Sequence, residues 1–427
     1  GLIIQNFTQS AISISGSGGN TIVGNWLGLD SAGTGASANG VGLSIFNSSN
    51  NVIGGTTAAD RNVISGNSNS GISITTDNST STGNQILGNY IGTNVAGTAA
   101  LANASNGISV ASANNTIGGT TAASRNIISG NSASGVVLTG TSATGNTISG
   151  NYIGLNAAGT AAIANVQIGV LITAGASGNT VGGATAGARN VVSGNTQYGV
   201  TVTGSGGAVA NNNVVQGNYI GTDAAGTTAL SNGGFGVVVD FLATNTSILG
   251  NVISGNTNAS WSLHRGGIYL SATGVTVQGN KIGVDATGAV LMGNGGGNST
   301  AGIFEAGASS DVLIGGTGSG QGNIIAGNTG AGIVVKADPG SVRILQNSIY
   351  SNTGLGIDLG NDGVTTNDLG DGDSGPNALQ NMPVLTSVVP STGQITINGT
   401  LNSSANSYFR VEFFSSAAVD SSGYGEG

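Results

Sequence analysis

Carboxylates are the first residues of this sequence to consider for chemistry, because an acid and a base are what polysaccharide cleavage needs. Three aspartates share one position of a recurring insertion, where two other copies carry asparagine: Asp30, Asp223 and Asp285, against Asn94 and Asn156. A hydrolase would need two or three carboxylates on neighbouring turns of the chain. These carboxylates are expected to lie far apart, so no residue is assigned a catalytic role.

The only histidine, His264, lies in "WSLHRGG", a local departure from the repeat that also contains Trp261 and Arg265. An irregular loop is the expected structure of this segment, and a site of some kind is the alternative. The sequence has no Asp-Asp pair and no Arg-x-x-Lys spacing of a lyase site.

A cluster of aspartates follows the repeats, in "NDGVTTNDLGDGDSG". Closely spaced carboxylates separated by glycine resemble the calcium loops of extracellular modules. A calcium site is therefore predicted at Asp362, Asp368, Asp371 and Asp373, although no glutamate follows at the spacing of an EF-hand. A solvated acidic linker is the alternative.

An aromatic residue recurs in the middle of "GNWLG" and three copies of "GNYIG", at Trp26, Tyr90, Tyr152 and Tyr219, before Lys281 takes the position. Outward rings about 10 Å apart would match a disaccharide step, and planar rings stack on sugars. This row is the predicted glycan-binding site. The alternative is that each ring only holds its own insertion in place. A second row is expected to bond to carbonyls of its own loops, with binding of a polyanion as the alternative: Arg61, Arg125 and Arg189.

These rows need a scaffold that repeats, and the sequence supplies one. "RNVISGN", "RNIISGN" and "RNVVSGN" begin at Arg61, Arg125 and Arg189, each 64 residues after the last. Each unit holds two turns of three short strands, of the kinds "GISI", "NQI" and "NYI". Strands this short cannot pair within one turn, so they must pair with the turns above and below. The result is a parallel β-helix whose strands stack about 4.8 Å apart.

Alternation within these strands predicts which side chains form the core. Ile72, Ile74, Ile86 and Ile91 should point inward, while Tyr90 points outward. Asparagine at the corners tolerates left-handed backbone and should form ladders between turns, with glycine beside it. The outward position of "GIxI" changes from serine to apolar residues along the chain, which indicates that loops or another chain cover the later turns.

With these motifs the chain resembles the right-handed parallel β-helix, or pectate-lyase-like, repeats of large bacterial secreted and surface proteins. The expected fold is all-β, a right-handed solenoid of about 12 rungs over residues 1–360, where a rung is one turn. An acidic Gly-rich linker is expected at 361–382. A partial antiparallel β-sandwich-like module is expected at 383–427, with strands in "QITINGTL" and "YFRVEFF", cut short at Gly427.

The composition excludes several classes of function. The 427 residues include 80 glycines and no cysteine, and the net charge of −9 leaves no basic cluster for nucleic acid. No apolar run is long enough for membrane insertion, and without an initiator Met the chain is expected to begin inside a larger protein. The resemblance implies a structural or adhesive, extracellular or cell-surface segment that binds polysaccharide or another copy of itself. The alternative is a carbohydrate-active enzyme: a lyase, hydrolase or epimerase.

Overall fold

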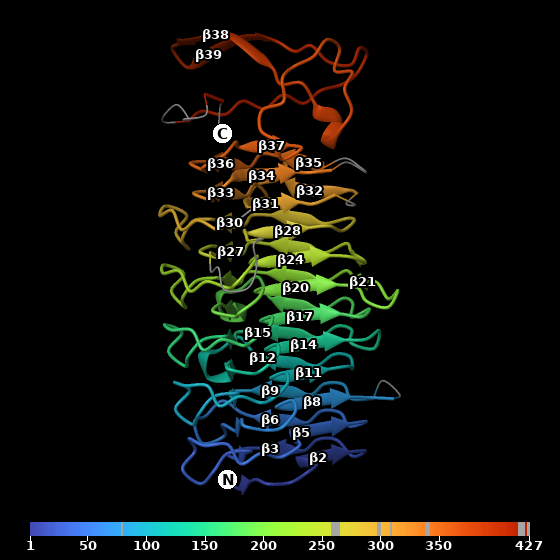
Figure 1. Cartoon of the computed structure of the whole chain (residues 1–427), viewed down its shortest axis with the longest axis vertical. Coiled ribbons are helices and arrows are strands. Elements are labelled where there is room, and N and C mark those ends of the chain that lie inside the picture. Colours follow the sequence, from blue (N-terminus) through green and yellow to red (C-terminus); the bar gives the residue numbers. More distant parts are fainter. Residues whose placement is uncertain are drawn as a thin grey trace.

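A stack of short turns forms most of the molecule in this computed structural model, which describes residues 1–77, 80–257, 265–296, 300–307, 310–337, 342–416 and 423–424 (Figure 1). Each turn adds one strand to each of three parallel sheets that run along the stack. The parallel β-helix predicted from the sequence is therefore confirmed, and two of its sheets contain 12 strands among the described residues.

The three sheets, named A, B and C here, follow one another around every turn. Sheet A contains β1 Ile3–Ile4, β4 Trp26–Leu27, β7 Val63–Ile64, β10 Tyr90–Ile91, β13 Ile127–Ile128, β16 Tyr152–Ile153, β19 Val191–Val192, β23 Tyr219–Ile220, β27 Val252–Ile253, β30 Lys281–Ile282, β33 Ile324–Ala326 and β36 Ser348–Tyr350. Sheet B contains β2 Ser10–Ser15, β5 Val41–Phe46, β8 Ile72–Thr75, β11 Ile108–Val110, β14 Val136–Thr139, β17 Val170–Thr173, β20 Val200–Thr203, β24 Val237–Asp240, β28 Ile268–Leu270, β31 Ala301–Glu305, β34 Ala331–Val335 and β37 Ile357–Leu359. Sheet C contains β3 Thr21–Ile22, β6 Val52–Gly54, β9 Gln85–Leu87, β12 Thr116–Gly118, β15 Thr147–Ser149, β18 Thr180–Gly182, β22 Val214–Gln216, β26 Ser247–Leu249, β29 Thr276–Gln278, β32 Val312–Gly315 and β35 Val342–Leu345.

A few short elements lie outside the three main sheets. Two strands pair in parallel beside sheet C, β21 Ala210–Asn211 and β25 Ala243–Thr244. The part of the chain that the structure describes also contains three short 3-10 turns, η1 Ala122–Ser124, η2 Ala186–Ala188 and η3 Pro376–Leu379.

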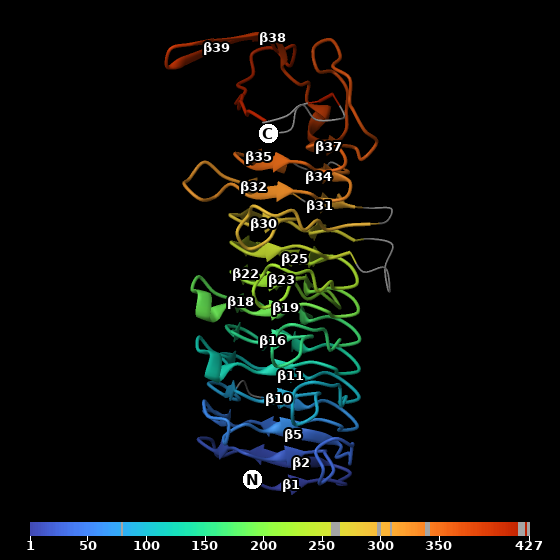
Figure 2. The same ribbon diagram turned by 90° about the vertical axis from the view of Figure 1, so that its left-hand side faces the viewer.

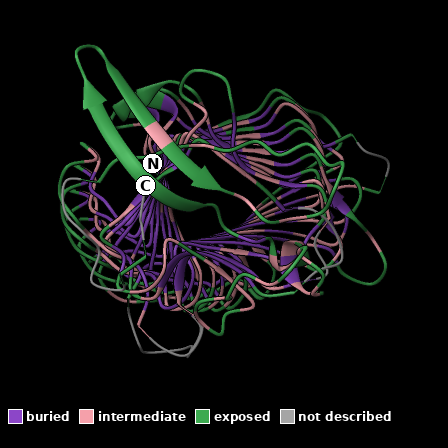
Figure 3. Ribbon diagram, turned by 90° about the horizontal axis from the view of Figure 1, so that it is seen from above, coloured by how far each residue is buried: buried purple, intermediate pink, exposed green. Residues whose placement is uncertain are grey.

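The core is a single aliphatic column inside the coil. Ile72 pairs with Ile108 and Ile108 with Val136 in successive rungs, and all three side chains are fully buried. Burying one such side chain contributes about 1.5–3 kcal/mol, so the column gains stability with every rung. Seen from above, the buried residues gather toward the inside of the coil (Figure 3).

Buried asparagine ladders join the rungs at the corners, as the sequence predicted. In the ladder that precedes sheet A, each Nδ2 and each backbone N–H donates to the Oδ1 of the next rung's asparagine. Its members from one end to the other are Asn25, Asn62, Asn89, Asn126, Asn151, Asn190, Asn218, Asn251, Asn280, Asn323 and Asn347. Similar ladders include Asn67 and Asn131 after sheet A and Asn84 and Asn146 before sheet C.

The apolar outward row of sheet B is covered by the chain itself. Phe304 and Val334 point outward from β31 and β34, yet only 2% and 1% of their surfaces are exposed. They pack in a cluster with Phe235 and Tyr269, and the rings of Tyr269 and Phe304 stack with centroids 6.1 Å apart. Intramolecular contacts therefore explain the shift from serine to apolar residues on these rungs.

Beyond β37 the chain leaves the solenoid and lies over its last rung (Figures 1 and 2). The strands β38 Val384–Ser391 and β39 Gln394–Thr400 pair antiparallel, as expected. The prediction of a strand in "YFRVEFF" is wrong, because residues 408–414 have no strand pairing. Two of their side chains, Arg410 and Glu412, form an ion pair with Nε and Oε1 2.7 Å apart, and Glu412 also contacts the last rung.

Candidate functional site

The predicted aromatic row exists in space. Tyr90, Tyr152 and Tyr219 lie in β10, β16 and β23 of sheet A, with one intervening strand between each pair. Their Cα partners in those intervening strands are Ile127 and Val191. The rings therefore recur every second rung on the outside of the sheet.

The arginine row meets the aromatic row, a contact that the sequence interpretation had not joined. Arg61 lies over the ring of Tyr90 with its Cζ 4.1 Å from the ring centroid. The same contact recurs at 4.1 Å between Arg125 and Tyr152, and at 4.0 Å between Arg189 and Tyr219. The prediction of bonds to carbonyls of the arginine's own loop is wrong, because Nε of Arg125 donates to Gly150 O at 3.2 Å and Nε of Arg189 to Gly217 O at 3.4 Å, both on the next rung. Nε of Arg61 is buried without a hydrogen-bond partner in the described structure. A guanidinium over an aromatic face contributes about 0.5–2 kcal/mol.

Each ring is also covered by the insertion that follows it. A Cβ built on Gly97 would lie 2.8 Å from Cε2 of Tyr90, and Gly159 and Gly226 approach their own tyrosines as closely. Only 9% of the surface of Tyr152 is exposed. A sugar could stack on these rings only after displacing the arginine or the loop.

The insertions also stack on one another. The backbone N–H of Ala157 donates to Gly97 O, that of Ala224 to Gly159 O and that of Ala286 to Gly226 O, each at 2.9 Å. These bonds join loops that are one 64-residue unit apart. The loops thus form an outer layer whose spacing follows that of the tyrosines.

The contact between arginine and ring does not form at either end of the row. Trp26 packs against its own loop at Gly33, and no arginine of the described residues lies over its ring. At the other end Lys281 replaces tyrosine, and its Nζ donates to Ala286 O. Gly250 stands there where the earlier units have arginine. Arginine and tyrosine are therefore lost together.

The recurring aspartates and asparagines hold the insertion loops in place by accepting hydrogen bonds from the loop backbone. Oδ1 of Asp30 accepts from the N–H of Ala32 and Thr34, and Oδ1 of Asn94 accepts from Thr98. Backbone N–H groups, that of Gly35 above all, hold the pKa of Asp30 below its usual value. The hydroxyl of Thr287 is the main cause of the lowered pKa of Asp285. Asparagine can replace aspartate here because the neutral oxygen accepts the same bonds.

Three of the four predicted calcium ligands lie together. Asp368, Asp371 and Asp373 each offer a carboxylate oxygen, and these oxygens are within 4.8 Å of one another, whereas Asp362 is not in the group. Asn381 N–H and Ser403 Oγ donate to Asp371. Oδ1 of Asp373 is buried without a hydrogen-bond partner in the described structure. Three carboxylates this close together, one of which has a buried oxygen without a partner, fit a hard cation such as Ca²⁺.

Other candidate chemistry is sparse in the described residues. His264 and Trp261 lie outside them, and the aspartate group above is the only set of three acidic or histidine side chains close enough to share an ion. The sequence interpretation missed two polar contacts on the last rung: Asn377 bonds to the backbone of Val342, and Glu412 to that of Gln346. No sequence signal marks them, because neither residue belongs to the repeat.

Comparison with known proteins finds only weak likeness to solved structures. No protein-family model and no curated protein matches the chain. Solved structures with some likeness include a mutant of the periplasmic alginate epimerase AlgG (12% identity, 81% of this chain and 70% of that one, TM-score 0.40). Others are tailspike protein 2 of Escherichia coli O157:H7 bacteriophage CAB120 (14%, 91% and 48%, 0.35) and the surface adhesin PfbA of Streptococcus pneumoniae (14%, 92% and 92%, 0.27). Likeness this weak carries no ligand or activity to this chain, which is a parallel β-helix protein by its own sheets.

Proposed function

We propose that this chain is a structural or adhesive segment of a secreted or cell-surface protein, a stiff rod without catalytic activity. One observation carries the proposal: the repeated outward side chains are engaged within the rod. Arg125 lies on Tyr152, the loops cover the rings, and the loop carboxylates accept bonds from their own backbone. A column of buried aliphatic side chains and buried asparagine ladders keeps such a rod straight. No helix of the described residues is long and apolar enough to cross a membrane.

Incubation with neutral and anionic polysaccharides tests this function. We expect no new reducing ends, no ultraviolet absorbance from unsaturated sugars and no change in sugar configuration by NMR. The basis is that the loop carboxylates already accept hydrogen bonds from the backbone of their own loops. Formation of any of these products would overturn the non-catalytic proposal in favour of a carbohydrate-active enzyme.

Glycan binding along Trp26, Tyr90, Tyr152 and Tyr219 stays a prediction, and so does self-association. The same polysaccharides, immobilised, test the first. If the row binds glycan, Tyr90→Ala should abolish retention while Tyr350→Ala, on the last strand of sheet A and outside the row, should not.

We further propose that Asp368, Asp371 and Asp373 hold a calcium ion that stiffens residues 361–416. An ion bound only by the folded segment stabilises it by about 2.7 kcal/mol at a hundredfold excess over the dissociation constant. Added CaCl₂ is expected to slow proteolysis within 361–416, and a chelator to reverse the effect.

The matched variants are Asp373→Asn and Asp362→Asn. The first removes a carboxylate of the group and should abolish both the protection and the heat of Ca²⁺ binding, whereas the second lies outside the group and should keep them. Equal protection in the Asp373 variant would contradict the site.

A further inference from the structure

Sheet C stops one strand short of its neighbours. Sheets A and B have 12 strands in the described residues and sheet C has 11. Its last strand, β35, pairs on one side with β32 only. After β37 the chain does not return to sheet C, and residues 361–416 pass over the last rung instead. The free edge of β35 is therefore the position of a twelfth strand.

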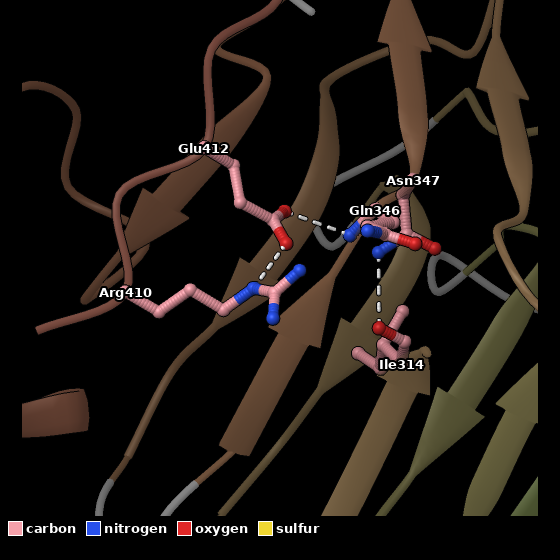
Figure 4. Close-up of polar contacts among 5 residues, drawn as sticks. All are labelled: Ile314, Gln346, Asn347, Arg410 and Glu412. Carbon is pink, nitrogen blue, oxygen red and sulfur yellow. Dashed lines mark hydrogen bonds and ion pairs between the residues drawn. The ribbon is translucent and has the colours of Figure 1, made fainter. Parts of the chain in front are cut away.

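Side chains hold the two ends of this edge. Asn377 bonds both backbone groups of Val342, because its Oδ1 accepts from the N–H and its Nδ2 donates to the C=O, each at 2.9 Å. Glu412 Oε2 accepts the N–H of Gln346 at 2.8 Å (Figure 4). The edge is thus satisfied at residues 342 and 346.

Between these two contacts, Ile344 presents its backbone to the same side. Successive residues of a strand direct their N–H and C=O groups alternately to its two edges. Leu345 O accepts from Gly316 N on the side of β32, which places the backbone groups of Ile344 on the free side. A donor and an acceptor therefore remain for an added strand.

A cavity of about 570 Å³ lies over this position. Core side chains line its floor, and Phe414 and Met382 from the overlying segment line its roof. The floor residues are Val342, Ile344, Ile349, Ile357 and Leu359. The volume falls in the range of ligand sites, and three residues of extended chain span only about 10 Å.

We propose that this cavity is a strand-addition site, which binds an extended segment of a partner protein as the twelfth strand of sheet C. The partner's chemistry follows from the sheet it would continue. Every inward position of the sheet is isoleucine or valine, as at Ile117, Ile148 and Ile314, so the partner segment places one such side chain on Ile344. Its backbone C=O and N–H before and after that residue bond Ile344. This binding site goes beyond the proposed rod function and does not depend on it.

A peptide that copies residues 116–118 of the chain, Thr-Ile-Gly with an acetyl and an amide end, tests the site on the full-length protein, because longer flanks would meet Asn377 and Glu412. In β12 the N–H of Thr116 donates to the preceding rung, so that of Gly118 faces the same way while that of Ile117 faces the next rung. Labelled peptide should raise fluorescence anisotropy saturably. N-methylation of the glycine should weaken binding about fivefold to tenfold, and N-methylation of the isoleucine should leave it nearly unchanged.

Protein variants give a second measurement. Phe414 lines the cavity, so the Phe414→Asp variant should not bind the peptide. Phe413 does not line the cavity, so the Phe413→Asp variant should bind the peptide as the wild type does. Both phenylalanines are more than half exposed, so neither change endangers folding.

Absence of saturable binding, or equal loss from the two N-methylated peptides, would overturn the proposal. Self-association of the protein alone in sedimentation velocity that the peptide reverses would also overturn it, because the occupant would then be a second copy.

Discussion

Replacing Asn151 with leucine is expected to lower the free energy of unfolding by at least about 3 kcal/mol. Asn151 is fully buried in the ladder that precedes sheet A. Its Oδ1 accepts from the N–H and the Nδ2 of Asn126, and its Nδ2 donates to Ile117 O at 2.9 Å. Leucine has a similar size but removes all three bonds and leaves the backbone N–H of Asn126 without a partner inside the rod, while Nδ2 of Asn126 keeps its bond to Ile86 O. Each unpaired buried group costs about 1–3 kcal/mol.

Urea unfolding followed by circular dichroism measures the loss. The matched control is Asn156→Leu, because Asn156 is only half-buried and its Oδ1 accepts from the N–H of Thr160 in a surface loop. We expect a loss of about 1 kcal/mol or less there. If both variants lost the same stability, the buried ladder would not be what joins the rungs.

The β-helix was predictable because its information is local and repeated. The spacing of Ile72, Ile108 and Val136 reveals which residues stack, since a rung cannot shift by one residue without turning its core side chains to solvent. Corner asparagines such as Asn126 are recognisable for the same reason. The same pattern recurs in every repeat, so it can be recognised even where one loop is irregular.

Contacts between rows and contacts outside the repeat were not predictable in this way. Arg61 and Tyr90 are on different rungs, and only the register of the coil brings the guanidinium over the ring. The sequence gives one indication of this pairing, because Gly250 replaces the arginine in the same repeat unit in which Lys281 replaces the tyrosine. Glu412 belongs to a segment that occurs once, so no repetition could mark its contact with the last rung.

The segment after the solenoid shows most clearly where prediction from the sequence fails. "YFRVEFF" alternates as a strand does, but alternation predicts a strand only when a free partner strand is available. In the structure Glu412 contacts the edge of β35 through its side chain, and the segment's own backbone forms no ladder. The sequence pattern gives a segment's tendency to form a strand, and whether the strand forms depends on a free partner strand.

The second large effect is expected at a glycine of the rung corners. Gly118→Ala should cost about 3 kcal/mol or more, because two penalties add. The residue has φ +84°, where an alanine costs about 1–2 kcal/mol. A Cβ there would also lie 2.0 Å from Ser149 O and 2.5 Å from Oδ1 of Asn151. Neither atom can yield alone, since both belong to the next rung and its ladder.

Gly140→Ala separates the two penalties, because Gly140 has the same φ of +84° and no atom within 4 Å of the Cβ position. Its loss in urea unfolding should be only the backbone cost of about 1–2 kcal/mol. The difference between the two variants then measures how tightly adjacent rungs approach at the corner. A difference near zero would mean that neighbouring rungs move apart freely, which the continuous ladder from Asn62 to Asn347 argues against.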